Sequence, residues 1–309
     1  MVLFYVLVTL LAVLMLAVLV APAELTALGL WFERRRSGLT LRQAHVDGFD
    51  IPYLEGGTGE VLLLIHGFGG DKDNFTRIAR FLTPHYRVII PDLPGFGDAT
   101  RNLKASYTMA EQVGRMHGLV TQLGITRLHI GGNSMGGFIA AQFAAPYGYM
   151  LGSLWLLDPS GTFASHNSPM LQAYQKTGKN PLLIEQVDHF NDTIRATTHK
   201  APFLPGFARQ TLGRRAVADF ALHTRIMRQL VDAPLLENSF QPMPTPALIV
   251  WGEQDQILSP AGAESFRLLF PNSSVIMMPE IGHLPMAEAP EQTARDYLAY
   301  RRTLAASAK

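Results

Sequence analysis

Short apolar runs that alternate with helix-like stretches constrain the fold of this 309-residue chain more than any other feature. Strands that alternate with helices predict a mostly parallel sheet that is covered by helices on both faces. The first two runs after Gly38, Thr40–Val46 and Phe49–Leu54, are expected to form a hairpin. Six further short runs are predicted as strands of the sheet: Val61–His66, Arg87–Pro91, Arg127–Gly131, Ser153–Leu157, Pro246–Gly252 and Ser274–Pro279.

One segment, residues 161–241, interrupts this alternation, because it contains helical patches but no convincing strand. It is too long for an ordinary connection between two elements of a compact domain. We therefore predict an inserted helical cap over residues 161–241. The cap would separate a first part of the core, residues 39–160, from a second part, residues 242–309.

The first 23 residues are apolar except for Thr9 and Pro22. As a helix they would extend about 34 Å, which is enough to cross a bilayer with some tilt. A cleaved signal peptide is the rival interpretation, since Ala21-Pro22-Ala23 resembles a cleavage site, and a buried helix of a soluble domain is the third. The run is longer than the apolar part of such peptides and no basic residue precedes it. We therefore predict an uncleaved transmembrane anchor over residues 1–23.

A juxtamembrane helix is predicted over residues 24–38. Trp31 and Phe32 precede the basic run Arg34–Arg36, an order typical of a helix that leaves a membrane through the headgroup region. Taken alone, the three arginines would place the following domain in the cytoplasm.

The composition excludes several classes of protein. The chain has no cysteine, which excludes a disulfide scaffold, a thiol nucleophile and a thiolate metal site. Charged residues make up 17% of the chain and the net charge is +1, a balance that does not suit a dedicated nucleic-acid binder. We expect neither a nucleic-acid partner nor a bound metal.

The motif Gly132-Asn133-Ser134-Met135-Gly136 directly follows an expected strand and opens a helix-like stretch. A serine on such a sharp turn has a strained backbone, and small neighbours let the turn form and let a substrate approach the serine oxygen. The helix N-terminus also directs backbone N–H groups to the place where negative charge develops. Ser134 is therefore the predicted nucleophile, and the alternative is a glycine-rich turn with an incidental serine.

A serine hydroxyl needs a base that removes its proton. His283 is the predicted base, because it follows the last expected strand at the sheet end that holds Ser134. Asp255 follows the preceding strand and is predicted to orient the imidazole, and Asp158, at the end of an earlier strand, is the alternative acid. The chain order Ser134, Asp255, His283 is the one expected for this kind of serine turn.

A glycine-rich turn, His66-Gly67-Phe68-Gly69-Gly70, follows the first buried strand. A backbone N–H in this turn is expected to face the carbonyl oxygen of a substrate, together with the N–H of the residue after the nucleophile. The backbones of Phe68 and Met135 are therefore the predicted oxyanion hole. Asp92, in a turn of the same sheet end, is predicted to bond to the backbone rather than to act in catalysis.

Four motifs, in this order, carry a resemblance that extends over residues 40–305: HGFGG at 66–70, GNSMGG at 132–137, WGEQD at 251–255 and GH at 282–283. The chain resembles the serine α/β-hydrolase family, and more narrowly its monoacylglycerol-lipase-like members and the bacterial membrane-anchored phospholipases A1. The resemblance implies an α/β-hydrolase fold with a helical lid, and acyl-ester hydrolysis by Ser134, His283 and Asp255 without a cofactor. It also implies dimerisation through the N-terminal helix and a single-pass protein of the inner membrane. Its catalytic domain would lie in the periplasm, against the argument from the three arginines, and we follow the resemblance.

The predicted function is hydrolysis of lipid esters at a membrane, through an acyl-enzyme, with a bilayer and a phospholipid, lysophospholipid or monoacylglycerol as partners. Carbon–carbon bond hydrolysis on the same fold and non-catalytic lipid binding by a membrane-tethered protein are the alternatives. Apolar residues of the cap are predicted to line an acyl tunnel, with packing of the cap as the alternative: Phe163, Leu182, Leu183, Phe190, Phe203, Leu204 and Phe207.

Overall fold

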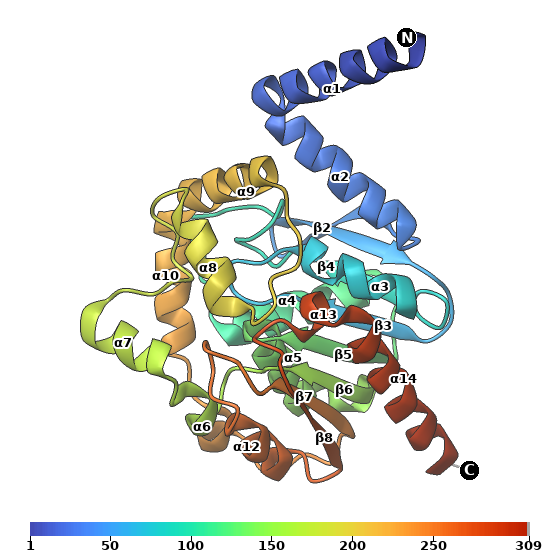
Figure 1. Cartoon of the computed structure of the whole chain (residues 1–309). Helices are drawn as coiled ribbons and strands as arrows, with labels where there is room; N and C mark the ends of the chain where they lie inside the picture. The colour runs from blue at the N-terminus through green and yellow to red at the C-terminus, as the bar shows by residue number, and fades with distance from the viewer. Residues whose placement is uncertain (308–309) are drawn as a thin grey trace.

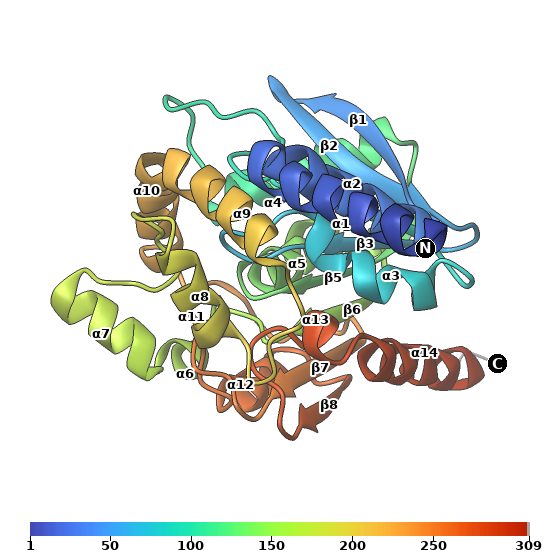
Figure 2. The ribbon, with the colours of Figure 1, turned by 45° about the horizontal axis from the view of Figure 1, so that its top comes forward.

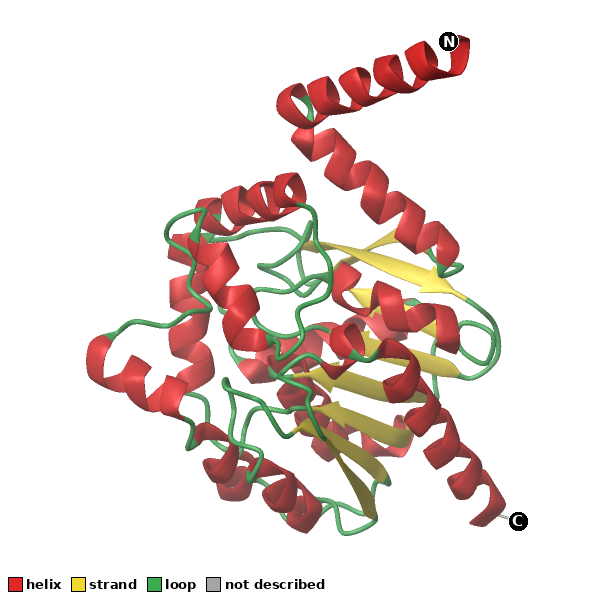
Figure 3. Ribbon diagram, viewed as in Figure 1, coloured by secondary structure: helices red, strands yellow, loops and turns green. Residues whose placement is uncertain are grey.

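The computed structural model describes residues 1–307, and their side chains except those of residues 3, 10–14, 17 and 307. Its centre is an eight-stranded sheet with the strand order β1-β2-β4-β3-β5-β6-β7-β8 (Figures 1 and 3). The second strand in sequence pairs antiparallel with its two neighbours, and all other neighbouring strands are parallel. The strands are β1 (Thr40–Val46), β2 (Phe49–Gly56), β3 (Val61–Ile65), β4 (Arg87–Pro91), β5 (Leu128–Asn133), β6 (Leu151–Leu157), β7 (Ala247–Gly252) and β8 (Ser273–Met278).

This sheet confirms the predicted mostly parallel α/β architecture. Each of the eight apolar runs forms a strand whose ends differ from the predicted ends by at most two residues. Such shifts are expected, because the apolar pattern marks the buried part of a strand and not the last hydrogen bond of the ladder. The last two residues of the predicted second core part, 308 and 309, lie outside the described residues.

Helices cover both faces of the sheet, and each face has its own apolar core (Figure 3). In β3, Leu63 and Ile65 point into one core and Leu62 and Leu64 into the other, since successive side chains of a strand alternate between faces. A strand buried on both faces therefore has a continuous apolar sequence. The covering helices are α3 (Thr76–Leu82), α4 (Met109–Gln122), α5 (Met135–Tyr147), α12 (Gly262–Leu269), α13 (Pro285–Glu288) and α14 (Pro290–Ser307), with the short turns η1 (Lys72–Phe75) and η2 (Gly148–Met150).

The segment between β6 and β7 forms a group of helices beside the carboxyl ends of the parallel strands (Figures 1 and 3). Its helix α9 carries Arg215, whose guanidinium lies 2.8 Å from Asp98 of the core. Arg101 of the core also pairs with Asp219, at the end of the same helix. The helices are α6 (Phe163–His166), α7 (Pro169–Thr177), α8 (His189–Thr197), α9 (Gly206–Ala218), α10 (Phe220–Val231) and α11 (Leu236–Ser239).

The N-terminal arm consists of α1 (Val2–Val20) and α2 (Pro22–Arg36). The two helices separate at Ala21, because a proline disfavours helical backbone at the preceding residue but is well suited to the first turn of a helix. The break between the two helices therefore lies at Ala21, two residues before the predicted end of the first segment at residue 23. Figures 1 and 2 show α2 returning to the body of the molecule, where it packs against α9.

Within the described chain, no helix combines the length and the apolarity that crossing a bilayer requires. The prediction of a transmembrane helix over residues 1–23 is therefore not confirmed. The arm is joined to the body by Arg34, whose Nε donates to Asp73 Oδ1 at 2.7 Å, and by Ser37, whose hydroxyl donates to the carbonyl oxygen of Thr76 at 2.7 Å.

Gly136 lies where α5 passes closest to the end of β3. A Cβ atom here would be 2.1 Å from the carbonyl oxygen of Ile65 and 2.5 Å from that of His66, whereas the Cβ position of Gly114 in α4 has nothing within 4 Å. We expect Gly136→Ala to lower the free energy of unfolding by more than about 2 kcal/mol, because the backbone must move. Gly114→Ala should raise it by about 0.5–1 kcal/mol. Thermal unfolding followed by circular dichroism measures both, and similar effects of the two substitutions would contradict this packing.

Candidate active site

Ser134 stands at the turn between β5 and α5, with φ 56° and ψ −120°. A positive φ is strained for a residue other than glycine, and such strain clusters at functional sites. The Ser134 N–H donates to the carbonyl oxygen of Leu157 at 3.0 Å, which ties the turn to the neighbouring strand β6. Ser134 lines a cavity of about 320 Å³ between the core, the cap and the N-terminal arm. The strained turn that the sequence predicted is thus present.

The glycines of the serine motif are required by close backbone contacts. A Cβ atom on Gly132 would lie 2.3 Å from the carbonyl carbon of Gly136. One on Gly137 would lie 2.8 Å from Cβ of Pro159. Because side chains cannot occupy these positions, the strand end, the turn and the first turn of α5 come into direct backbone contact.

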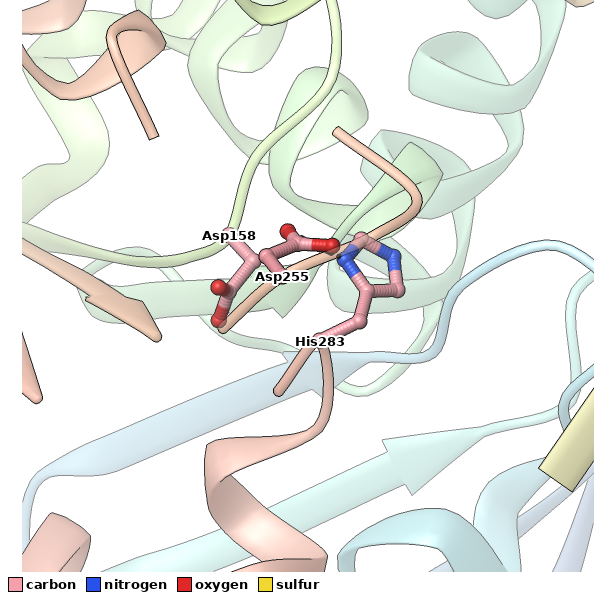
Figure 4. Close-up of side chains that lie close together, drawn as sticks. All are labelled: Asp158, Asp255 and His283. Atoms are coloured by element: carbon pink, nitrogen blue, oxygen red, sulfur yellow. Dashed lines mark hydrogen bonds and ion pairs between the residues drawn. The ribbon is translucent and has the colours of Figure 1, made fainter. Parts of the chain in front are cut away.

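His283 and Asp255 form a buried pair beside this turn. His283 Nδ1 lies 2.7 Å from Asp255 Oδ2, and the two side chains are 4% and 0% exposed (Figure 4). Asp255 accepts three further hydrogen bonds, from Trp251 Nε1 at 3.2 Å and from the N–H groups of Ile257 at 2.8 Å and Leu258 at 3.1 Å. Donors around a carboxylate stabilise its ionised form, so Asp255 can orient the ring and stabilise an imidazolium.

The loop between β8 and α13, which carries His283 and is called the histidine loop below, contacts the end of β7, the serine turn and the cap. A Cβ atom on Gly252 would lie 2.0 Å from the carbonyl oxygen of Gly282, so glycine lets the end of β7 touch this loop. Asn133, next to the serine, donates through Nδ2 to the His283 carbonyl oxygen at 2.9 Å. The His283 N–H donates to Thr197 of the cap at 2.9 Å. The sequence did not predict this role of Asn133, because nothing in the motif indicates that the residue before the serine bonds to the histidine loop.

Ser134 and His283 line the same cavity. Among the described residues, the Ser134 hydroxyl makes no hydrogen bond to a protein group. Catalytic hydrogen bonds are often long before substrate binds and tighten in the complex. The serine and the paired imidazole thus border one cavity.

The two amides predicted as an oxyanion hole lie beside the serine. Neither the Phe68 nor the Met135 N–H donates to a protein acceptor in the described part of the chain. Phe68 lines the serine cavity, and a Cβ atom on Gly67 would lie 3.1 Å from Cβ of Ser134. Two uncommitted donors next to a nucleophile suit a developing oxyanion.

A buried ion pair joins the segment that follows the predicted oxyanion turn to the turn that carries Asp92. Lys72 Nζ lies 2.7 Å from Asp92 Oδ2, and both side chains are fully buried. Asp92 also accepts from the backbone N–H groups of Lys72 and Asp98, each at 2.7 Å. The prediction that Asp92 bonds to the backbone is confirmed, but its lysine partner was missed. A lysine next to a glycine turn is usually exposed, so the sequence carries no signal for this pair.

Asp158, the alternative acid, does not bond to His283. It follows β6 with φ 44°, and its Oδ1 accepts from the Gly252 N–H at 2.8 Å. The structure therefore pairs the imidazole with Asp255, which reaches Nδ1 from the loop after β7.

The structure corrects the predicted substrate-binding residues. Leu204 lines the serine cavity, but Phe163 and Phe203 are 59% and 82% exposed and do not, and Phe207 is half-buried outside it. Apolar periodicity gives the composition of a helix face but not which neighbour that face meets, so it does not place these three relative to the cavity. The apolar lining comes from the arm, the turn after β3, the cap and the histidine loop: Leu30, Phe68, Leu182, Phe190, Ile194, Leu204, Leu212, Ala216 and Leu284.

A strained serine, a buried aspartate–histidine pair and a helical insertion at the carboxyl ends of a parallel sheet define the α/β-hydrolase class. The chain belongs to this family, because the family model for the alpha/beta hydrolase fold matches residues 60–290. Lipase 1 of Psychrobacter immobilis is 38% identical over 281 residues, which are 89% of this chain and 88% of the relative. The monoacylglycerol lipase ABHD6 of Mus musculus is 26% identical and covers 90% of this chain and 88% of its own. The crystal structure of a membrane phospholipase A matches with a TM-score of 0.89 at 39% identity, over 98% of this chain and 99% of that chain.

His66 opens the predicted oxyanion turn and is fully buried in the neutral form. Its Nδ1 lies 2.8 Å from the Gly67 carbonyl oxygen, and its Nε2 accepts from the Leu93 N–H at 3.0 Å. Burial is the main cause that lowers the pKa of His66 to about 4. An unfolded histidine has a pKa near 6.5, so between pH 6.5 and 4 the unfolded chain binds the proton more strongly. The contribution of neutral His66 to stability is therefore complete above pH 6.5 and is lost as the pH falls towards 4.

His66→Gln tests this contribution, because the glutamine oxygen can accept the Leu93 N–H but cannot become charged. The free energy of unfolding of the wild type minus that of the variant should fall by up to about 3 kcal/mol between pH 6.5 and 4. Other groups, such as Asp71, whose pKa burial raises to about 7, titrate in both proteins and cancel in the difference. Denaturant unfolding at several pH values measures it, and a difference that is constant with pH would refute the assignment.

Proposed function

We propose that this protein is a serine hydrolase that cleaves carboxylic esters of lipids through an acyl-enzyme. The observation that carries the proposal is the buried His283–Asp255 pair on the same cavity as the strained Ser134. Relatives that are named lipase, monoacylglycerol lipase and membrane phospholipase A support a lipid ester as the substrate.

In the proposed mechanism the Ser134 oxygen attacks the ester carbonyl carbon while His283 Nε2 takes the serine proton. The carbonyl oxygen becomes an oxyanion that accepts hydrogen bonds from the Phe68 and Met135 N–H groups. The imidazolium, stabilised by Asp255, then gives its proton to the leaving alcohol oxygen, and the acyl group stays on the serine. A water molecule, deprotonated by the same imidazole, then attacks the acyl carbonyl carbon. The bond from this carbon to the Ser134 oxygen breaks, the imidazolium returns the proton to that oxygen, and the fatty acid leaves.

The cavity supports a substrate with an acyl chain. Its apolar wall is formed by side chains of the cap, among them Leu182, Phe190 and Leu204. Its lining also includes charged side chains, among them Arg77 and Asp73, which suit the polar part of a lipid. Apolar walls with a few polar groups at one end are usual for sites that orient an amphipathic ligand.

We expect Ser134→Ala to lower the hydrolysis of a short-chain nitrophenyl ester by at least about a thousandfold, because the nucleophile is lost. Ser274→Ala, an exposed serine on β8, is the matched control and should leave the rate unchanged. A fluorophosphonate probe should label the wild type and the control but not Ser134→Ala. Full activity of Ser134→Ala with an unchanged melting temperature would overturn the assignment.

Mass spectrometry of products from mixed phospholipids and monoacylglycerols extends the same experiment to the natural substrate class. Wild type should release free fatty acid and the matching alcohol, and Ser134→Ala should not. Absence of both probe labelling and ester turnover would favour the non-catalytic lipid-binding alternative. Hydrolysis of a carbon–carbon bond, with no turnover of lipids, would favour the carbon–carbon hydrolase alternative.

We further propose that the N-terminal arm attaches the protein to the inner membrane, with the catalytic domain in the periplasm and dimerisation through the arm. Large apolar side chains on both helices are exposed, among them Phe4, Leu19 and Phe32. The arm also carries Arg34–Arg36, which suit lipid headgroups. Since Leu30 of α2 lines the serine cavity, attachment through the arm would bring the cavity mouth close to lipid.

Removal of residues 1–20 should abolish sedimentation with membranes while hydrolysis of the nitrophenyl ester is retained, because the ester site keeps α2 and Leu30. Intact mass measurement of the full chain should show that the arm is still attached, which distinguishes an anchor from a cleaved signal peptide. Protease digestion of spheroplasts should cleave the domain, and cross-linking should give dimers only with the arm present. Unchanged sedimentation of the shortened chain would contradict the proposal.

A further inference from the structure

Asp158 is a second carboxyl group behind the aspartate–histidine pair. It is fully buried, and one of its oxygens, one oxygen of Asp255 and one ring nitrogen of His283 all lie within 4.8 Å of one another. Figure 4 shows Asp255 between the other two side chains. Asp158 Oδ1 accepts from the Gly252 N–H at 2.8 Å, but Oδ2 has no partner among the described groups. A buried polar atom without a partner requires an explanation, since it has lost water without gaining a bond.

The two buried carboxyl groups compete for a single charge. Two buried carboxylates so close together are not both ionised, because their repulsion and the loss of hydration add. Asp255 accepts four hydrogen bonds, whereas Asp158 accepts one. The negative charge is therefore held on Asp255, where the donors are.

Burial and the neighbouring negative charges also favour the protonated form of Asp158. Burial, followed by the charge of Asp255, raises the pKa of Asp158 well above its usual range, and the charge of Glu288 raises it further. The ionisable groups that face Asp158 are thus Asp255, Glu288 and the ring of His283.

The backbone holds Asp158 in this place. It has one of the positive φ values of the described chain outside glycine, and its N–H donates to the Val250 carbonyl oxygen at 2.9 Å. Together with the bond from the Gly252 N–H, this fixes the end of β6 to the end of β7. A short polar side chain tolerates such a conformation, which explains why an aspartate can occupy it.

We propose that Asp158 keeps its proton at the working pH and donates it in a hydrogen bond to Asp255. The hydrogen on Oδ2 gives the otherwise partnerless oxygen a partner. Asp158 is then a positioning residue: it holds the Asp255 carboxylate in line with His283 Nδ1 and leaves one negative charge beside the imidazole. The proton stays on Asp158 throughout the reaction. The inference rests on the proposed function only where ester hydrolysis is the readout.

Asparagine is the neutral isostere of a protonated aspartate, because its oxygen can accept from Gly252 and its amide can donate to Asp255. Asp158→Asn should keep kcat/KM for the nitrophenyl ester within about threefold of wild type, with the acid limb of the pH profile unchanged. Asp158→Ala loses both bonds, and its kcat should fall roughly 10- to 100-fold, the range expected when a hydrogen bond to a charged group is removed. Its KM should change little, and its acid limb should move to higher pH, because an Asp255 without this donor stabilises the imidazolium more strongly.

An ionised Asp158 gives the opposite result. Its charge would itself stabilise the imidazolium, so Asp158→Asn would move the acid limb to lower pH and lose as much activity as Asp158→Ala. Either outcome would overturn the proposal. A purely structural role would lower the melting temperature of both variants without moving the pH profile of either, and would also overturn it.

Infrared spectroscopy tests the protonation directly, without a substrate. Wild type at neutral pH should show the carbonyl stretch of a protonated carboxylic acid, and Asp158→Asn should lack it. Asp71, whose pKa burial raises to about 7, is removed from the comparison by recording both spectra in an Asp71→Asn background. Absence of the band from the Asp71→Asn protein refutes the inference. Failure of lipid hydrolysis with the band present would instead refute only the proposed function.

Discussion

The hydrogen bond from His283 to Asp255 is the interaction on which the candidate site depends. Both groups are out of water, where a hydrogen bond is strong but an unpaired charge is very costly. The Asp255 carboxylate is tolerated because Trp251 and two backbone N–H groups of its own loop also donate to it. The loop after β7 is therefore shaped around one negative charge. That charge in turn sets the tautomer and the direction of the imidazole that faces the serine cavity.

This bond can form only where backbones touch without side chains between them. Gly252 lets the end of β7 lie against the histidine loop, and Gly136 lets α5 begin against the end of β3. Protein interiors are close-packed, so a single added methyl group at such a contact would separate the segments that carry the three side chains. The glycines are thus as necessary to the chemistry as the residues that perform it.

The serine cavity is a joint product of three parts of the chain. The core supplies Ser134 and His283, the cap supplies most of the apolar wall, and the N-terminal arm supplies Leu30. The cap is also bonded to the histidine loop through Thr197, so a displacement of the cap would break a contact of the base itself. Access to the site and the geometry of the site are therefore linked.

The sequence by itself determined the elements of the sheet and the chemistry at their ends. Strands that are buried on both faces must be apolar, and a serine on a tight strand-to-helix turn must have glycine neighbours, so both leave local patterns. Only the tertiary structure decided which acid meets His283, that Lys72 is buried against Asp92, and that Leu30 rather than Phe163 or Phe203 reaches the cavity. These facts depend on contacts between segments far apart in the chain, and neither periodicity nor spacing encodes the direction in which such segments meet.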